Sequence, residues 1–154
     1  MKKIWIFLAT GAGLGFSPVA SGTVGSVWGP LIVWAMQDLS LALYLVVCVV
    51  LTLVAIPICG EAEKILGKKD DGRIVADEYM TFPICMIGLP FVPWVVVLAF
   101  LSNRFFDIWK PPPARQLQAI KGGTGVVIDD VMACLYSLAF NHLIVWLAAR
   151  YIAV

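Results

Sequence analysis

The sequence contains little charge: Asp, Glu, Lys and Arg make up only 14% of its 154 residues. Soluble domains contain about 25% charged residues. Hydrophobic residues account for 61% of the chain, and the mean hydropathy is +0.92. This combination excludes an ordinary water-soluble monomer and predicts an integral membrane protein. The formal net charge of +1 gives no electrostatic reason to expect nucleic acid as a partner.

Several common catalytic groups are also missing. The only histidine, His142, lies inside an apolar segment, where a buried packing role is the simpler interpretation. The chain has no GxSxG motif, and no cysteine precedes an arginine at the spacing of a phosphatase loop. Covalent catalysis through serine and histidine, or through cysteine, is therefore disfavoured. Attack of water on phosphorus with the help of a metal ion remains open.

Cysteine is present but without a metal or redox pattern. All four cysteines lie in apolar segments without CxxC spacing, which predicts buried structural thiols: Cys48, Cys59, Cys85 and Cys134. At the N-terminus, Lys2 and Lys3 precede an apolar run of about six residues, shorter than the roughly 7–15 of a signal peptide. We therefore expect this segment to remain on the mature chain.

Long apolar segments dominate the chain. Residues 41–59 are long enough to cross a hydrocarbon core of about 30 Å at 1.5 Å per residue. An apolar segment at 24–36 precedes them, and the polar turn at 37–40 predicts a helical hairpin. A last apolar segment covers 131–149. The sequence thus predicts an all-α, polytopic helical membrane protein, with residues 1–154 as one membrane-embedded domain.

A further apolar segment, residues 82–101, is interrupted by residues that break helices: Pro83, Gly88, Pro90 and Pro93. All basic residues except Arg150 lie at the N-terminus or in the polar stretches 60–81 and 102–130. Lysine and arginine prefer the cytoplasmic side of a membrane. Both stretches should therefore face the cytoplasm, so the segment between them is predicted to enter and return as a re-entrant or broken helical pair.

Most acidic residues gather in the same polar stretches, in tight groups: Asp70–Asp71, Asp77–Glu78, Asp107 and Asp129–Asp130. Carboxylates that converge from several segments suit a hard cation such as Mg²⁺. For Asp70, a solvated loop charge is the simpler interpretation. Asp129 and Asp130 are flanked by apolar residues, where a charge is costly unless it is paired or bound to metal.

Two further features could bind an anion. Arg104, Asp107 and Lys110 are spaced by three, so they lie near one helical face. They could form a phosphate-and-metal arrangement or an interfacial pair that extends toward water. The glycine-rich residues 11–26 lead into a helix near residues 23–26, whose free amides could bind an anion. Close helix packing through small residues is the alternative.

Taken together, four motifs identify a family. "GLGFSPVASGTVGS", "DDGRIVADEYM", "RFFDIWKPPP" and "GGTGVVIDDVMA" occur in this order, and the sequence resembles phosphatidylglycerophosphatase A over nearly its full length. The resemblance implies an all-helical, Mg²⁺-dependent enzyme of the bacterial inner membrane. Such an enzyme acts on a phospholipid in the bilayer, removing the terminal phosphate of phosphatidylglycerophosphate to leave phosphatidylglycerol. The family motifs place these acids in the catalytic site: Asp77, Glu78, Asp107, Asp129 and Asp130.

The resemblance also implies roles for individual groups. One or two Mg²⁺ at the cytoplasmic boundary would be held by Asp77, Glu78, Asp129 and Asp130, and a metal-activated water would attack phosphorus. Substrate would be bound by Thr23, Ser26, Arg104, Lys110 and Lys121. The sequence departs from the family at Pro112, where a tryptophan is usual, and at Thr81 and Cys134, where glycine is common. These departures bear on local backbone geometry and substrate fit.

Two other functions are consistent with a helical membrane protein that carries clustered acids. A CDP-alcohol phosphotransferase is also helical and uses aspartates with Mg²⁺, but here Arg73 follows Asp71–Gly72 at once, and no alanine–arginine pair stands at the required place. The second alternative is a non-catalytic membrane protein, such as a transporter subunit whose charges line an ion path. It predicts function without metal and no phosphatase activity.

Overall fold

The computed structural model describes residues 2–117 and 119–151, which form helices and loops without any strand. This confirms the all-α prediction. In chain order the elements are α1 (Lys2–Ala9), η1 (Leu14–Phe16), α2 (Ser21–Gly25), α3 (Trp28–Met36), α4 (Leu41–Leu66), α5 (Ala76–Thr81), η2 (Phe82–Met86), α6 (Pro93–Trp109), α7 (Ala114–Leu117) and α8 (Gly123–Tyr151).

Within the described residues, α4 and α8 are the helices long and apolar enough to cross a membrane. At 1.5 Å per residue they extend for about 39 and 43 Å. Only 17% and 22% of their most apolar windows is buried, unlike the core helices of a soluble protein. Exposed apolar side chains cover much of α4, among them Leu41, Leu45, Val46, Val49, Val50, Leu53 and Val54. A large exposed apolar surface of this kind is suited to lipid.

Two helices, α3 and α4, are joined at the predicted turn 37–40, but only α4 is long enough to cross a membrane. The helix before the turn, α3, begins only at Trp28 and has nine residues, or about 14 Å. It packs mainly against η2 and α5. Gly29 permits this packing, since a Cβ there would lie 2.5 Å from the Phe82 ring. The following helix, α4, starts where Ser40 Oγ accepts a hydrogen bond from the Leu43 amide, and it continues to Leu66.

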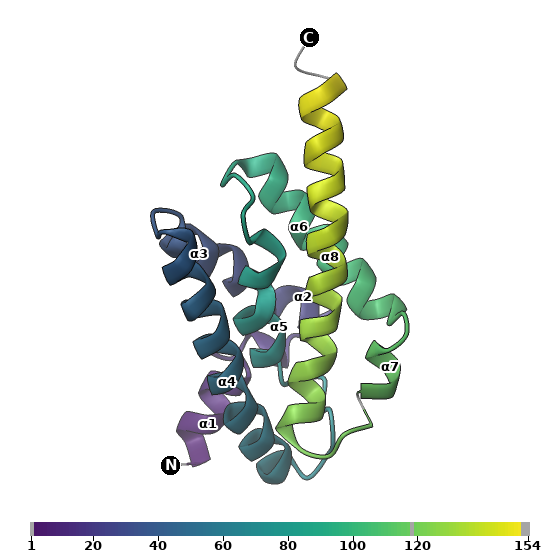
Figure 1. The fold of residues 1–154 in the computed structure, drawn as a ribbon. Helices are drawn as coiled ribbons and strands as arrows, with labels where there is room; N and C mark the ends of the chain where they lie inside the picture. Colours follow the sequence, from purple (N-terminus) through teal and green to yellow (C-terminus); the bar gives the residue numbers. More distant parts are fainter. Residues whose placement is uncertain (1, 118, 152–154) are drawn as a thin grey trace.

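The apolar segment 82–101 is broken, as its prolines predict. It begins as η2, continues through the loop 87–92, where Gly88 has φ +71°, and ends in α6, which starts at Pro93. Figure 1 shows that this loop lies toward the same end as the C-terminus of α8, and that α6 returns toward the end that holds α7. The segment therefore leaves the end of the molecule that holds α7 and returns to it. The polar stretches before and after the segment lie together at that end.

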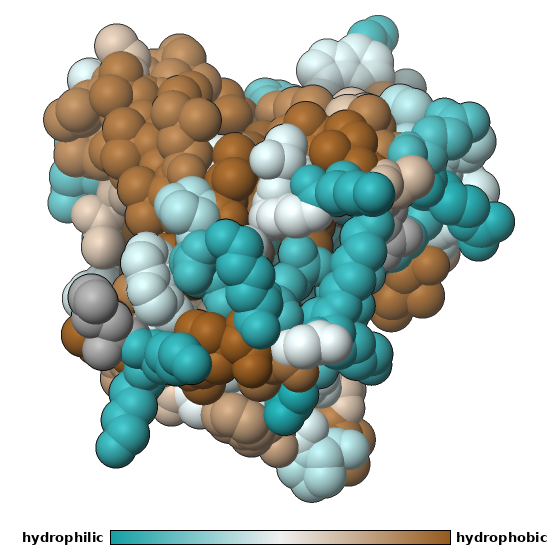
Figure 2. Space-filling view, turned by 90° about the horizontal axis from the view of Figure 1, so that it is seen from below, coloured by the Kyte–Doolittle hydropathy of each residue, from teal (hydrophilic) through white to brown (hydrophobic). Residues whose placement is uncertain are grey.

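That polar end is the lower one in Figure 1, where α1, the end of α4, α7 and the start of α8 lie together. Figure 2 views it directly: hydrophilic side chains gather across its middle, and hydrophobic surface lies around them, most extensively at the upper left. The chain has thus separated its charged residues from its apolar helix surfaces, although these residues come from distant parts of the sequence.

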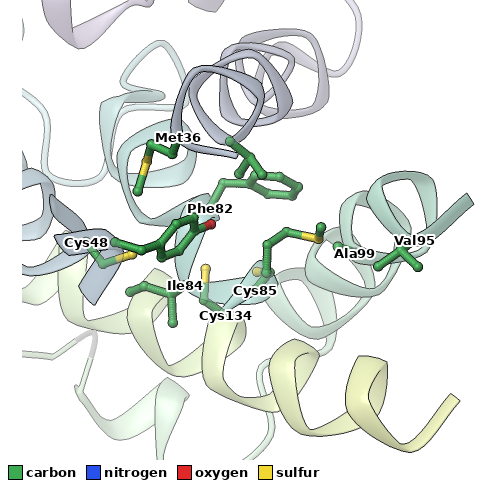
Figure 3. Packing of buried hydrophobic residues seen from close by; sticks show 11 residues of the cluster. Met36, Cys48, Phe82, Ile84, Cys85, Val95, Ala99 and Cys134 are labelled. Carbon is green, nitrogen blue, oxygen red and sulfur yellow. The ribbon is translucent and has the colours of Figure 1, made fainter. Parts of the chain in front are cut away.

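Two apolar clusters hold the helices together. The cluster in Figure 3 places Phe82 and Cys85 of η2 against α3, α4 and α8, with Cys48 and Cys134 in contact with the same group. The other cluster includes Cys59. All four cysteines are buried and free, which confirms the prediction for them. His142 was expected to be buried, but it is exposed, and its Nε2 lies 2.9 Å from the Ile87 carbonyl oxygen.

A buried polar seam joins α6 to α8. Ser102 Oγ lies 2.5 Å from Ser137 Oγ and donates to Asn141 Oδ1 at 2.9 Å. Asn141 Nδ2 in turn donates to the Cys85 carbonyl oxygen of η2 at 3.2 Å. Hydrogen bonds of this kind hold helices together where apolar packing alone has no preference for protein over lipid. The seam therefore fixes the register of α6 and α8, and with it the relative positions of their charged residues.

Candidate active site

The first two acids of the site lie in the first turn of α5. Asp77 is 5% exposed, and its backbone carbonyl accepts a hydrogen bond from Thr81 Oγ1 at 2.6 Å. Burial raises the pKa of Asp77 well above its usual value, and the neighbouring charge of Glu78 raises it further. A carboxylate in such a place is stable in its charged form only when a cation approaches it.

Glu78 is held by groups from two other elements. Its Oε2 accepts a hydrogen bond from Ser26 Oγ and lies 3.0 Å from Arg104 Nη1. Burial raises the pKa of Glu78, although Arg104 and Ser26 lower it. Its Oε1 faces the backbone of α2 at Gly22, where a Cβ would lie only 2.5 Å away. Gly22, in the glycine-rich stretch, therefore allows the backbone of α2 to lie directly against the Glu78 carboxylate.

Arg104 links α5 to α6. Its Nη2 lies 3.3 Å from Asp107 Oδ2, one turn further along α6, so the predicted common face of these two residues is correct. Its Nε and Nη2 have no hydrogen-bond acceptor within the part of the chain that the structure describes, although the residue is only 9% exposed. These N–H groups are therefore buried donors without a hydrogen bond to the described residues, although Nη2 also forms the ion pair with Asp107.

Lys110 lies beyond the last residue of α6, in a left-handed conformation with φ +49°, and not on the helical face predicted for it. Its Nζ forms an ion pair with Asp129 Oδ2 on α8. Burial lowers the pKa of Lys110, but the hydrogen bond to Asp129 and the nearby carboxylates outweigh burial and raise it. The lysine therefore remains charged beside the acids.

Asp129 and Asp130 lie in the second turn of α8, because this helix begins at Gly123, eight residues before the apolar segment 131–149. Both are 4% exposed. The start of α8 rests on the backbone of α4: a Cβ at Gly123 would lie 2.0 Å from the Ile56 carbonyl oxygen. This glycine allows the helix to approach closely, which places both aspartates inside the protein.

The donor set fits a hard cation. Three buried carboxylate oxygens have no hydrogen-bond partner among the described residues, namely Asp77 Oδ1, Asp129 Oδ1 and Asp130 Oδ1. In residues 2–117 and 119–151, no three acidic, histidine or cysteine side chains form a group that could hold a metal by themselves. Mg²⁺ seldom needs such a cage, since it keeps several waters and is held by one or two carboxylates together with substrate phosphate. The residues present therefore fit Mg²⁺ shared with a phosphate ligand.

The structure brings most of the predicted site residues into one region, where Ser26, Arg104 and Lys110 pair with its carboxylates. Two predicted substrate-binding residues lie apart from these contacts. Thr23 is exposed on α2, and Lys121 is exposed just before α8. The amide of Ser26 donates to the Gly22 carbonyl at 2.8 Å, so it is not the free helix-terminal amide that the sequence suggested.

Sequence reasoning missed Asn103. This residue is 1% exposed, its Oδ1 accepts from Cys134 Sγ at 3.4 Å, and its Nδ2 has no partner among the residues described. Cys134 lies one turn after Asp130 and also contacts Thr81 Oγ1 at 3.5 Å. Asn103 therefore contacts α8 through a residue that lies one turn after Asp130. The sequence offered one indication of this role, since a polar asparagine stands next to Arg104 in an otherwise apolar helix.

The fold and this region together define a class: a helical protein with lipid-suited helix surfaces and a buried site of carboxylates and cations at its polar end. A model of the family phosphatidylglycerophosphatase A matches residues 7–145. The chain belongs to that family.

Curated relatives agree with this assignment. Phosphatidylglycerophosphatase A of Escherichia coli K12 is 34% identical over 146 residues, covering 94% of this chain and 85% of the relative. The Haemophilus influenzae protein of the same name is 34% identical, with 90% of each chain covered. A Bacteroides thetaiotaomicron protein named "Putative phosphatidylinositol-3-phosphatase" is 34% identical, covering 92% of this chain and 93% of its own. No solved structure matches the chain.

Proposed function

We propose that this protein is a Mg²⁺-dependent lipid phosphatase that converts phosphatidylglycerophosphate to phosphatidylglycerol at the membrane surface. The main support is the set of unpartnered buried carboxylate oxygens on α5 and α8, beside two cations supplied by Arg104 and Lys110. Buried acids without partners cost free energy, and they are retained where a cation completes them. Membership of the phosphatidylglycerophosphatase A family supports the choice of substrate.

One or two of the aspartates with an unpartnered oxygen, Asp77, Asp129 and Asp130, would hold the metal together with water and the substrate phosphate. When bound, Mg²⁺ supplies positive charge that activates water and neutralises phosphate oxygens. Glu78 is already engaged through Oε2 by Ser26 and Arg104, so its main effect would be to orient the guanidinium. Asp107 would hold the other side of the same group.

Arg104 and Lys110 would bind the phosphate that is removed. The Nε and Nη2 groups of Arg104 form no hydrogen bond with the residues described, and a planar guanidinium binds two phosphate oxygens side by side. Lys110 would contribute a mobile point charge while it neutralises Asp129. These groups stabilise the charge that accumulates on the transferring phosphoryl group.

The proposal places α4 and α8 across the inner membrane of a bacterium, with the polar end at the cytoplasmic surface. Their exposed apolar side chains suit lipid tails, and almost all basic residues lie at the polar end, in keeping with the positive-inside rule. The segment 82–101 would then be re-entrant. A lipid substrate could keep its tails in the bilayer while its headgroup reaches the carboxylates.

The phosphotransferase alternative uses an aspartate that is already occupied here. Asp71 accepts two hydrogen bonds from the Arg73 side chain, each at 2.8 Å, and one from the Arg73 amide at 3.0 Å. Both of its oxygens are therefore engaged by a neighbouring residue. This arrangement favours a structural role for the Asp71–Gly72 pair.

The decisive experiment measures phosphate release from phosphatidylglycerophosphate in detergent micelles, with Mg²⁺ and with chelator. Wild type is compared with Asp129→Asn, and phosphatidylinositol 3-phosphate is tested in parallel. The proposal expects Mg²⁺-dependent release that the variant loses while it remains folded. If a folded, Mg²⁺-supplied wild type releases no phosphate from either lipid, the phosphatase proposal is wrong. Faster release from the inositol lipid would reassign the substrate.

A further inference from the structure

A cation-lined cavity lies beside the carboxylate site. It measures about 320 Å³ and is formed by the end of α6 and by α7, with Trp109, Lys110, Pro111, Pro112, Arg115 and Gln116 as its lining. Lys110 belongs to both places: its side chain lines the cavity while its Nζ pairs with Asp129. The Lys110 side chain therefore connects the cavity to the carboxylate site.

The walls of this cavity are anchored to the helix bundle. Tyr136 of α8 donates a hydrogen bond through its hydroxyl to the Pro112 carbonyl oxygen at 2.6 Å. Ala114, at the start of α7, is 1% exposed and is covered by neighbouring residues. Phe106 lies between Trp109 and Tyr136, with ring centroids 6.2 and 5.8 Å from theirs. The loop after α6 is thus a fixed surface.

Arg115 supplies a second positive charge to the cavity. It forms no hydrogen bond or ion pair within residues 2–117 and 119–151, and it is exposed. A guanidinium in this state is well suited to bind phosphate oxygens in pairs. The cavity thus presents one cation that is engaged with the carboxylates and one that is available. A ligand with two anionic groups on a short linker fits this arrangement.

We propose that this cavity binds the phosphodiester of the substrate headgroup, with Arg115 as its ligand, while the terminal phosphomonoester lies at Arg104 and the carboxylates. This inference rests on the proposed phosphatase function and specifies its selectivity. A lipid whose phosphomonoester is separated from the diacylglycerol by a phosphodiester and a polyol engages both places. Phosphatidate, whose phosphomonoester is attached directly to diacylglycerol, engages only the first. The exposed Trp109 at the cavity edge suits an interfacial position, where the diester of a membrane lipid lies.

The test compares wild type, Arg115→Gln and Arg115→Lys in kinetics on phosphatidylglycerophosphate and on phosphatidate with the same acyl chains. A charge-assisted hydrogen bond to phosphate predicts that Arg115→Gln raises KM for phosphatidylglycerophosphate about tenfold or more, with kcat little changed. KM for phosphatidate should stay the same, and Arg115→Lys should restore part of the affinity. Lys68→Gln, which removes an exposed charge of the loop after α4, is the matched control.

Product inhibition gives a readout that does not require phosphatidate to be a substrate. Phosphatidylglycerol carries the diester alone, so its inhibition constant should rise in Arg115→Gln by a factor similar to that for KM. Equal effects on both substrates, or unchanged constants for phosphatidylglycerophosphate and phosphatidylglycerol in a folded variant, would overturn the role of Arg115 and leave the phosphatase function intact. A wild type inactive on every lipid phosphomonoester would instead overturn the function itself.

Discussion

Lys110 and Asp129 form an ion pair that ties the residue after α6 to the second turn of α8. The pair explains how one of two adjacent buried aspartates is kept charged. Oδ1 of both aspartates has no hydrogen-bond partner among the residues described, but Asp130 also lacks an ion pair with any of these residues. The two aspartates therefore differ in what their removal should do.

We expect Asp130→Asn to separate activity from stability. The amide is nearly isosteric with the carboxylate, but it removes the charge that would hold Mg²⁺, so kcat should fall by about 10²-fold or more. Because a buried unpaired charge is removed, the variant measured in chelator should unfold at the same temperature as wild type or higher. Phosphate release and thermal unfolding in detergent check both halves, and a clear loss of stability with chelator would contradict the explanation.

In contrast to Asp130→Asn, Lys110→Gln should lower both the stability and the activity of the protein. It leaves Asp129 buried without its cation, so stability and activity should fall together. The double variant Lys110→Gln, Asp129→Asn should recover the thermal stability but not the activity. If the double variant were no more stable than Lys110→Gln alone, the ion pair would not be what holds α6 to α8 at this point.

Arg104 is the most connected charge of the site, since it contacts both Glu78 and Asp107. Arg104→Gln should leave two carboxylates without their cation and lower the free energy of unfolding by roughly 3–5 kcal/mol. Arg150→Gln is the control, because that arginine is exposed near the end of α8 and lies over the Trp146 ring. Reversible unfolding in mixed micelles measures both. A similar small change in the two variants would argue against the role assigned to Arg104.

Gly22 should tolerate no side chain. Gly22→Ala places a Cβ 2.5 Å from Glu78 Oε1 and 3.1 Å from Arg104 Nη1, which displaces the glutamate from the guanidinium. We expect a fall in kcat/KM of about tenfold or more, corresponding to the loss of one charge-assisted contact. Gly72→Ala is the control, since its Cβ would meet nothing nearer than Ser21 Oγ at 3.9 Å. Equal activity of the two variants would contradict this prediction.

The Asp71–Arg73 pair should make stability depend on pH in the acid range. The Arg73 side chain lowers the pKa of Asp71 from 3.8 to about 2. Because the pKa is lower in the folded state, the stabilisation is complete above about pH 4 and is lost as the pH falls toward 2. The difference in unfolding temperature between wild type and Arg73→Gln should therefore be largest near pH 5 and fall to a small part of that value near pH 2. A difference that does not change with pH would rule out this pair as its cause.

The sequence by itself determined the helical class of the protein and the family to which it belongs. Low charge and long apolar segments predicted a helical membrane protein, and the helical fold is confirmed. The prolines of residues 82–101 predicted the break that the structure contains, because proline acts locally on the backbone. The spacing of Arg104 and Asp107 likewise predicted their contact, since residues three apart in a helix are neighbours.

Only the tertiary structure decided which charges meet and which remain unpaired. The last apolar segment begins at residue 131, but α8 begins at Gly123, in close contact with the α4 backbone, and Asp129 and Asp130 are buried. The pairing of Lys110 with Asp129, and of Ser26 with Glu78, joins residues 19 and 52 positions apart. Contacts at such separations depend on how the helices pack, and local sequence patterns carry no information about that.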